Sequence, residues 1–311
     1  MQSIEEKKMN LIEINSIIDK VILEFEESPV DFFNNGAKGE LLYLNQMKSS
    51  YIRTIVDIVS SVPPNKNIKV LEIGSFLGIV SIVLSKIGYE VYSTELPEFI
   101  SNKNLQRKLE ENGVSYHQVN LKNYSLPFSP NTFDIVIMCE VLEHLNFNPI
   151  PIIKEINRIE KINGLFYLSL PNLASLGNRI KLLRGQSIHN RIEDYFLELN
   201  PDVKWVGAIH WREYTITEIS EMLDKFDFYI DKQYYFDSSD LLKISWSLKA
   251  LLKKAILSMF PSLKGNQTTI GRKTKNSVYK FFFSEATLPG NFSPKHDLDS
   301  SVIRSADRIM N

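Results

Sequence analysis

Three ionisable side chains stand close together directly after a run of apolar residues. Glu140, Glu143 and His144 follow the segment 133–139 at positions i, i+3 and i+4. This spacing places all three near one face of a single helical turn. Carboxylates and an imidazole grouped in this way can act in general acid–base chemistry, or they can hold a divalent cation. Both hypotheses remain open from these residues.

A second group of residues is arranged to bind a ligand. The segment 68–73 is apolar enough for a strand covered on both faces, and it runs into a turn bracketed by Gly74 and Gly78. Missing side chains there let a ligand lie against bare backbone. The spacing excludes a dinucleotide fingerprint, which needs glycine where Phe76 stands, and no Gly-Lys-Ser/Thr closes the turn as in a P-loop.

A carboxylate ends the next predicted strand, 90–94. Glu95 lies 17 residues beyond Gly78, close to the spacing of about 20 residues that is typical between a glycine turn and a ribose-binding acid. A carboxylate offers two acceptor oxygens and can therefore bind both ribose hydroxyls of a nucleoside cofactor. The alternative is an ordinary surface glutamate.

These residues stand in the order of a known family. Glu72-x-Gly74-x-x-x-Gly78 resembles motif I of the class I S-adenosylmethionine-dependent methyltransferases, with Phe76 where a middle glycine is more usual. The block 126–145 closely resembles the segment that follows strand four in that family. The resemblance covers roughly residues 40–170. It implies that S-adenosylmethionine is the cofactor and that the following residues bind it: Glu72, Gly74, Gly78, Glu95, Asn120, Leu121 and Cys139.

The segment ahead of motif I carries a further resemblance. Residues 44–52 resemble a helix of the ubiquinone-pathway O-methyltransferases, in which a basic residue pairs with the carboxylate of the cofactor. Lys48 stands at the matching position, as lysine rather than arginine, which gives up bidentate geometry. The alternative is a solvated helix lysine.

The group of Glu140, Glu143 and His144 also resembles an element of known methyltransferases. Glu-x-x-Glu-His resembles the metal-binding element of small-RNA 3′-terminal 2′-O-methyltransferases and of ubiquinone-pathway O-methyltransferases. In the RNA enzymes a later histidine completes the site, and His210 is the candidate here. A site of Glu140, Glu143, His144 and His210 would suit Mn²⁺, Fe²⁺, Co²⁺ or Zn²⁺, and Mg²⁺ with added waters. In the alternative, His144 or His210 is the catalytic base and the glutamates hold it in place.

We therefore predict an S-adenosylmethionine-dependent methyltransferase that methylates a hydroxyl of a small molecule or glycan intermediate. One alternative is a methyltransferase-like subunit that binds the cofactor without turnover, which Phe76 suggests. Another is an RNA 2′-O-methyltransferase, but the net charge of −1 and the lack of a basic domain argue against nucleic acid. Decarboxylation or aminopropyl transfer would need distinguishing acids that the sequence does not show.

The alternation of strand and helix patterns predicts the α/β scaffold that positions these residues. The resemblance implies a Rossmann-like seven-stranded sheet, mostly parallel, with helices on both faces and an antiparallel hairpin at the end. We predict N-terminal helices in 1–62 that cap the cofactor site, a methyltransferase domain in 63–283, and a poorly ordered tail in 284–311.

Two insertions stand out. Residues 171–212 are irregular and locally basic, and they follow strand five, so we expect them to form a lid over the acceptor pocket. Its basic residues could bind a phosphate or carboxylate, or could form a solvated surface. The helix 240–260 has an apolar face and a lysine-rich face. It could lie on an anionic membrane, cover the acceptor pocket, or pack on its own domain or on a second subunit of a homodimer, and we favour packing.

Composition sets the remaining bounds. The chain has 311 residues, 43% of them hydrophobic, which is enough for a proper core. The single cysteine, Cys139, excludes an internal disulfide and fits a reducing compartment. The charged N-terminus is no signal peptide, and no run approaches the roughly 20 apolar residues of a membrane span. We predict a soluble, cytoplasmic protein.

Overall fold

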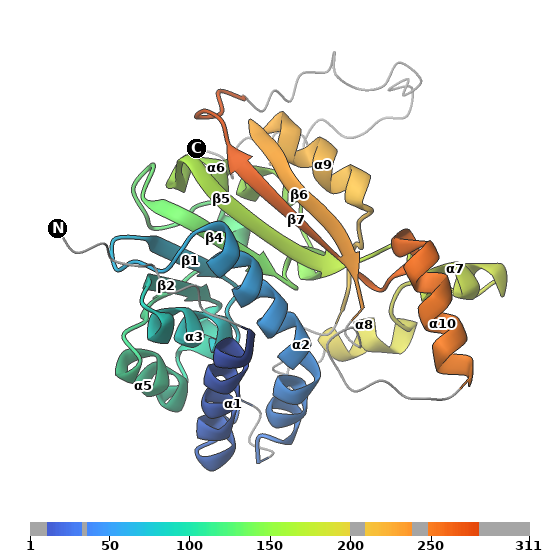
Figure 1. Cartoon of the computed structure of the whole chain (residues 1–311), viewed down its shortest axis with the longest axis horizontal. Helices are drawn as coiled ribbons and strands as arrows, with labels where there is room; N and C mark the ends of the chain where they lie inside the picture. The colour runs from blue at the N-terminus through green and yellow to red at the C-terminus, as the bar shows by residue number, and fades with distance from the viewer. Residues whose placement is uncertain (1–10, 33–35, 200–208, 238–247, 280–311) are drawn as a thin grey trace. The chain divides into compact units, whose positions relative to one another are not determined.

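A seven-stranded sheet in the order β3-β2-β1-β4-β5-β7-β6 runs through the computed structural model, which describes residues 11–32, 36–199, 209–237 and 248–279 (Figure 1). Strands β3, β2, β1, β4 and β5 pair in parallel, and β7 is antiparallel to both β5 and β6. The predicted mostly parallel sheet with a closing antiparallel hairpin is confirmed. The strands are β1 (Lys69–Ile73), β2 (Glu90–Glu95), β3 (Ser115–Gln118), β4 (Phe133–Cys139), β5 (Glu160–Pro171), β6 (Phe228–Phe236) and β7 (Asn266–Lys273).

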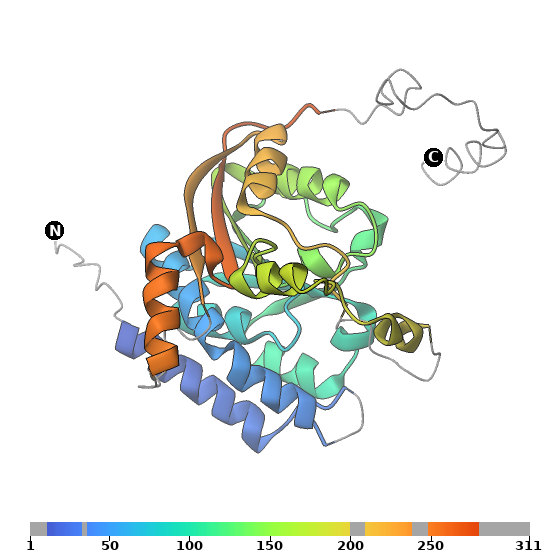
Figure 2. The ribbon, with the colours of Figure 1, turned by 90° about the vertical axis from the view of Figure 1, so that its right-hand side faces the viewer.

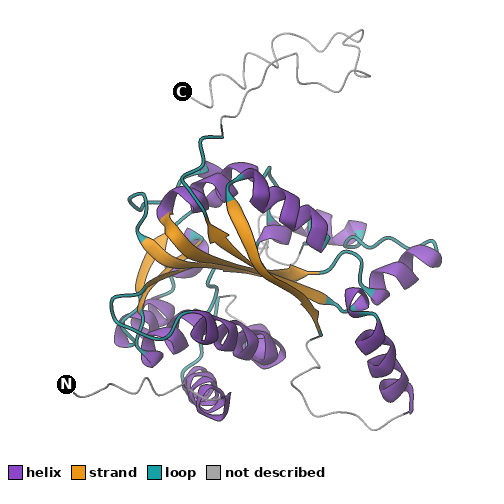
Figure 3. Ribbon diagram, turned by 45° about the horizontal axis from the view of Figure 1, so that its top comes forward, coloured by secondary structure: helices purple, strands orange, loops and turns teal. Residues whose placement is uncertain are grey.

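Helices cover both faces of this sheet (Figure 3). The α-helices are α1 (Leu11–Glu27), α2 (Lys38–Ser61), α3 (Ile79–Ile87), α4 (Pro97–Ile100), α5 (Lys103–Glu111), α6 (Ile150–Ile159), α7 (Leu176–Leu183), α8 (Ile192–Glu198), α9 (Ile216–Lys225) and α10 (Leu248–Met259). Short 3₁₀ turns are η1 (Leu121–Asn123), η2 (Leu142–His144) and η4 (Pro261–Leu263). In the described ranges no helix combines the length and the apolar character that crossing a membrane requires.

The alternation of side chains along the central strands creates two core layers. Val70 of β1 and Ile135 of β4 join one layer, with α1, α2, α3 and α5, whereas Leu71 and Val136 join the other, with α6 and α9. Side chains with period two point to opposite faces of a sheet. A parallel strand that carries apolar residues at consecutive positions is therefore covered on both sides, as the segment 68–73 predicted.

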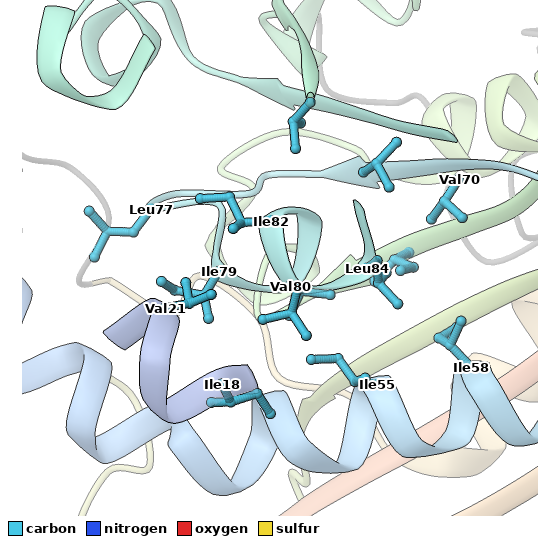
Figure 4. Close-up of a cluster of buried hydrophobic side chains, with 14 of the residues drawn as sticks. Ile18, Val21, Ile55, Ile58, Val70, Leu77, Ile79, Val80, Ile82 and Leu84 are labelled. Carbon is cyan, nitrogen blue, oxygen red and sulfur yellow. The ribbon is translucent and has the colours of Figure 1, made fainter. Parts of the chain in front are cut away.

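The N-terminal helices belong to the first of these layers. Ile18 of α1 and Ile55 of α2 face Val80 of α3 in the close-up of this core (Figure 4). Helix α2 is also fastened to the far hairpin, because Asp57 accepts a hydrogen bond from Lys232 of β6 at 2.9 Å. The expected helical extension is thus part of the core that positions the carboxyl ends of the strands.

Two predicted segments extend beyond what the structure describes. The helix expected over 240–260 is described only as α10, because residues 238–247 lie outside the described ranges. The tail predicted to be poorly ordered, 284–311, lies outside them entirely. The segment between β2 and β3 forms two helices, because Pro97 begins α4 and Asn102 caps α5 by accepting hydrogen bonds from the backbone amides of Asn104 and Leu105.

The packing of α2 on the sheet gives a direct test. Ile55 is fully buried, so Ile55→Ala should lower the free energy of unfolding by about 2–5 kcal/mol, through lost burial and a residual cavity. Leu42 lies on the same helix with 60% of its surface exposed, and Leu42→Ala should change stability by no more than about 0.5 kcal/mol. Denaturant unfolding measures both, and equal losses would contradict this role of α2.

Candidate functional site

A pocket lies at the carboxyl ends of the central strands, with about 450 Å³ of atom-free space that opens to solvent. The glycine turn after β1, the ends of β4 and β5 and one side of α2 line it. Open α/β sheets bind their ligands at this edge. The lining residues are Tyr43, Met47, Ser50, Tyr51, Thr54, Glu72, Gly74, Ser75, Phe76, Val80, Cys139, Glu140 and Ser169.

The turn after β1 requires glycine at both of its ends. Gly74 has φ +71°, donates its N–H to the Thr94 carbonyl at 2.9 Å, and leaves no room for a side chain, because a Cβ there would lie 2.4 Å from a Val141 methyl carbon. Gly78 also has φ +71°, and a Cβ there would approach Leu109 to 2.7 Å. Packing within the protein therefore requires both glycines; Gly74 lines the pocket and Gly78 does not, so the expected contact of Gly78 with a ligand remains a prediction.

Phe76 occupies the middle of this turn at φ +47°, a conformation that L-residues rarely adopt. Its ring packs against Phe32, Tyr43 and Phe99, with ring centroids 5.2, 5.2 and 5.5 Å away. This aromatic packing compensates for the unfavourable backbone. The turn stays tied to the end of β2, because the Phe76 N–H donates a hydrogen bond to Glu95.

Glu95 ends β2 beside the glycine turn, and its carboxylate is largely buried. One oxygen accepts a hydrogen bond from the Phe76 amide at 2.6 Å, and the other accepts one from the Leu96 amide at 2.7 Å. Burial raises the pKa of Glu95, and the two amide donors oppose that rise. Each carboxylate oxygen can accept a second bond, so the group is held in place with acceptor capacity left for two ribose hydroxyls.

Glu72, the first residue of the motif, is also buried against the turn. Its carboxylate accepts hydrogen bonds from the backbone amide and the hydroxyl of Ser81 at the start of α3. Burial raises the pKa of Glu72 to about 7, although both bonds from Ser81 act in the opposite direction. The pocket therefore contains a carboxylate whose charge a bound cationic cofactor would stabilise.

The structure brings the ionisable residues together from two distant segments. Glu143 and His144 lie on η2, and the segment before α9 brings His210 beside them, so that potential ligand atoms of the three residues lie within 4.8 Å of one another. The His144 and His210 ring centroids are 4.8 Å apart. Glu140 is the exception among the four predicted ligands, because φ +53° turns the chain there and its carboxyl lines the cofactor pocket instead.

Each histidine is oriented by a hydrogen bond at Nδ1. The Nδ1 of His144 lies 2.9 Å from the carbonyl of Ile209, and the Nδ1 of His210 lies 3.0 Å from a carboxylate oxygen of Glu213. Because both partners are acceptors, each Nδ1 must donate its hydrogen, which leaves the lone pair on Nε2. Burial lowers the pKa of His144 to about 4, so its ring is neutral at pH 7.

The Glu143 carboxyl is completely buried beside these rings. Its side chain shares a hydrogen bond with that of Glu140, which requires one of the two carboxyls to keep its proton, and its Oε1 lies 3.8 Å from the Nε2 of His144. Burial raises the pKa of Glu143 well above its ordinary value, and the negative charge of Glu140 adds to the rise. Its backbone carbonyl accepts the Trp211 amide at 2.7 Å, which fixes the segment around His210 over the turn.

The remaining predicted cofactor residues differ in position. Cys139 lines the pocket, with its sulfur 3.8 Å from the Thr54 hydroxyl. Lys48 does not line it and forms an ion pair with Asp19 of α1, so its expected pairing with the cofactor carboxylate remains a prediction. The reason is helix phase, since the pocket lies against a different side of α2.

Asn120 and Leu121 follow β3 at the same edge, but neither side chain lines the pocket. The Asn120 side chain accepts the Lys122 amide at 3.0 Å and caps η1, and Leu121 is buried in the core layer of α6. Their expected contact with the cofactor remains a prediction.

Sequence reasoning missed two residues of the site. Glu213 orients His210, and its other oxygen accepts a 2.7 Å bond from Asn178 of α7, so the predicted lid reaches the histidine through it. The spacing His210-x-x-Glu213 could have indicated this pair. Tyr43 lines the pocket from α2, and burial raises the pKa of its hydroxyl far above the ordinary value. No local pattern marked it.

Comparison with known proteins gives the class. Residues 43–233 match a family described as "Methyltransferase domain". This match covers more than half of the chain, and the strand order and glycine turn agree with it. The chain belongs to this family and is a class I S-adenosylmethionine-dependent methyltransferase.

Its relatives include ubiquinone biosynthesis O-methyltransferases. One from Pelagibacter ubique is 27% identical over 223 residues, which cover 68% of this chain and 83% of the relative. The mitochondrial protein of Dictyostelium discoideum is 24% identical over 237 residues, but the match spans just 66% of its length. A Haloferax volcanii methyltransferase, solved with the activator Trm112, shares the fold at a TM-score of 0.54 and 15% identity, over 79% of this chain and 98% of that one.

The first prediction from the site concerns Glu95. Glu95→Ala removes the acceptor for the ribose hydroxyls and should weaken S-adenosylmethionine binding by roughly 1.5–3 kcal/mol, which calorimetric titration measures. Glu98 is exposed three residues later, so Glu98→Ala should leave the affinity unchanged. Equal affinity in the wild type and Glu95→Ala would contradict this assignment.

The second prediction concerns Glu72 and pH. Below pH 4.5 the carboxyl is protonated in both the folded and the unfolded chain, so it contributes nothing. Between 4.5 and about 7 the unfolded chain loses the proton first, and stability falls, by roughly 3 kcal/mol in total. Glu72→Gln should therefore stabilise the cofactor-free protein above pH 7 and change nothing near pH 4. Denaturant unfolding at both pH values checks this, and a pH-independent effect would be inconsistent with it.

Proposed function

We propose that this methyltransferase methylates a hydroxyl group of a small molecule or glycan intermediate, with a divalent cation bound by Glu143, His144 and His210. The relatives whose names specify O-methylation support the choice of oxygen. The observation that carries the proposal is the pair of oriented histidines beside the completely buried Glu143 carboxyl.

The donor set fits a cation on physical grounds. A divalent cation beside the buried Glu143 carboxyl would favour its charged form, which burial alone disfavours. A histidine that binds a metal usually donates the N–H of its other ring nitrogen to a carbonyl or carboxylate. Here the Ile209 carbonyl and the Glu213 carboxylate accept these hydrogen bonds. One carboxylate and two imidazoles favour Mn²⁺, Fe²⁺, Co²⁺ or Zn²⁺ over Mg²⁺, which prefers oxygen ligands.

Methyl transfer from a sulfonium is a direct displacement. The acceptor oxygen bonds to the methyl carbon as the bond from carbon to sulfur breaks, and the hydroxyl loses its proton. The protein's main task is alignment, which the glycine turn and Glu95 serve by holding the cofactor. A bound divalent cation would lower the pKa of the acceptor hydroxyl. Glu140 lines the same pocket and is placed to accept the released proton.

A lone histidine base is the second candidate. His144 is neutral at pH 7 and keeps a lone pair on Nε2, so it can accept a proton without any cation. His210 has the same orientation through Glu213. Without a cation the raised pKa keeps the Glu143 carboxyl protonated, and this mechanism gives no role to the convergence of two imidazoles on that carboxyl, which is why we place it second.

Metal removal separates the two mechanisms. Chelator should abolish methylation of a phenolic or sugar-diol acceptor, and Mn²⁺ should restore it. Glu143→Gln keeps the shape but removes the charge, and should weaken Mn²⁺ binding by about 10–100-fold in calorimetric titration. The exposed Glu193 provides the matched control, since Glu193→Gln should bind Mn²⁺ normally. Full activity in chelator, with loss confined to one histidine variant, would support the lone base instead.

A further inference from the structure

Helices α7 and α10 expose apolar side chains at one end of the molecule. Leu183 of α7 is 88% exposed, and Leu252 and Met259 of α10 are 61% and 67% exposed. Large apolar residues scattered singly over a surface need no explanation, but a group of them on neighbouring helices indicates a binding surface. We propose that α7 and α10 dock the enzyme on an anionic lipid bilayer.

The apolar stripe of α10 points away from the protein. Among residues 251–260, Leu257 alone is buried, with 6% of its surface exposed. Because each helical residue advances by about 100°, Leu251, Leu252 and Met259 lie on the side opposite Leu257. Leu257 packs against the rest of the chain, and the expected packing of this helix on its own domain or on a second subunit remains a prediction.

Lysines border this stripe on both sides. By the same helical rotation, Lys253 and Lys254 lie between the apolar stripe and Leu257, one on each edge, and both are exposed. Helices that lie in a membrane interface have this arrangement, with the apolar side in the acyl region and lysines reaching the headgroups.

Helix α7 extends the surface. Asn178 anchors one side of it by bonding to the Leu173 carbonyl and to Glu213, and Ile180 and Leu183 lie on the opposite side, exposed. The segments 173–192 and 248–279 contain no aspartate or glutamate, whereas the exposed cations of α7 and its C-terminal end include Lys181 and Arg184.

The two helices are held next to each other. Asn172, just before α7, donates its side-chain amide to the carbonyls of Ser262 and Lys264, just after α10, at 2.9 and 2.8 Å. Its backbone N–H also bonds to the Gly265 carbonyl at 2.8 Å. Figure 1 shows α7 and α10 at the same end of the molecule, and in Figure 2 α7 begins near α10 and runs away from it.

Charge decides which partner fits this surface. In a two-fold dimer the same patch meets its own copy, and here both copies would present only positive charge from α7 and α10. An anionic bilayer supplies negative headgroups for the lysines and an apolar interior for the leucines. Docking would place the site next to the membrane surface, because α7 also holds Glu213 and through it His210.

Cosedimentation with vesicles tests the proposal without cofactor or acceptor, so its outcome is independent of the proposed chemistry. The protein should sediment with phosphatidylcholine–phosphatidylglycerol vesicles and not with pure phosphatidylcholine. Added salt should release it, because the Debye length falls from about 10 Å at 0.1 M to about 3 Å at 1 M. Lys253→Gln and Lys254→Gln should each weaken binding roughly 5-fold.

Charge reversal within the apolar stripe gives the sharper variant. Leu252→Glu combined with Met259→Glu should abolish sedimentation while leaving the far-UV spectrum and the melting temperature unchanged. Ile12→Glu, at a position on α1 that is 79% exposed, is the matched control and should bind as the wild type does. The proposal is overturned if the wild type remains in the supernatant at low salt. It is also overturned if the Leu252→Glu/Met259→Glu variant sediments with the vesicles as much as the Ile12→Glu control does. It is also overturned if Leu252→Glu only converts a dimer to a monomer in light scattering.

Discussion

The burial of one carboxyl group, that of Glu143, is the constraint on which the site depends. Its side chain shares a hydrogen bond with that of Glu140, and its backbone carbonyl fastens the segment that carries His210. A carboxylate in such a place is stable only if it is protonated or if a cation lies beside it. In either state, the hydrogen bonds at Nδ1 position the two histidine rings. The acceptors of these bonds, Ile209 and Glu213, therefore determine the geometry of the site.

The fold supplies the position of every group in this arrangement. Two core layers clamp the central strands, and the carboxyl ends of β1, β2 and β4 then carry the glycine turn, Glu95 and Glu140 to one edge. The pocket and the histidine group are therefore neighbours for a topological reason, since loops that follow parallel strands meet at the same edge. The acidic character of this edge suits a sulfonium cofactor, and it suits a divalent cation as well.

The sequence predicted the parts of the site that lie within one local pattern. The glycine turn, the acid after β2 and β4 itself follow from periodicity and spacing, and the structure confirms them. Lys48 could not be placed in this way, because a matched position on α2 does not reveal which side of the helix faces the pocket. Glu213 and Tyr43 come from segments far from the motif, and their role depends on tertiary contacts that no spacing encodes. The position of Glu140, which lines the pocket and still shares a hydrogen bond with Glu143, depends on a backbone φ of +53° that no spacing reveals.

The central claim is that Glu143, His144 and His210 hold a divalent cation beside the cofactor. A crystal structure with S-adenosylhomocysteine and Mn²⁺, with anomalous scattering recorded, tests it most directly. The account predicts one strong anomalous peak in contact with the Nε2 atoms of both histidines and with a Glu143 oxygen, and no such peak in Glu143→Gln crystals. An ordered acceptor hydroxyl bonded to a histidine Nε2, with no anomalous peak nearby, would contradict it.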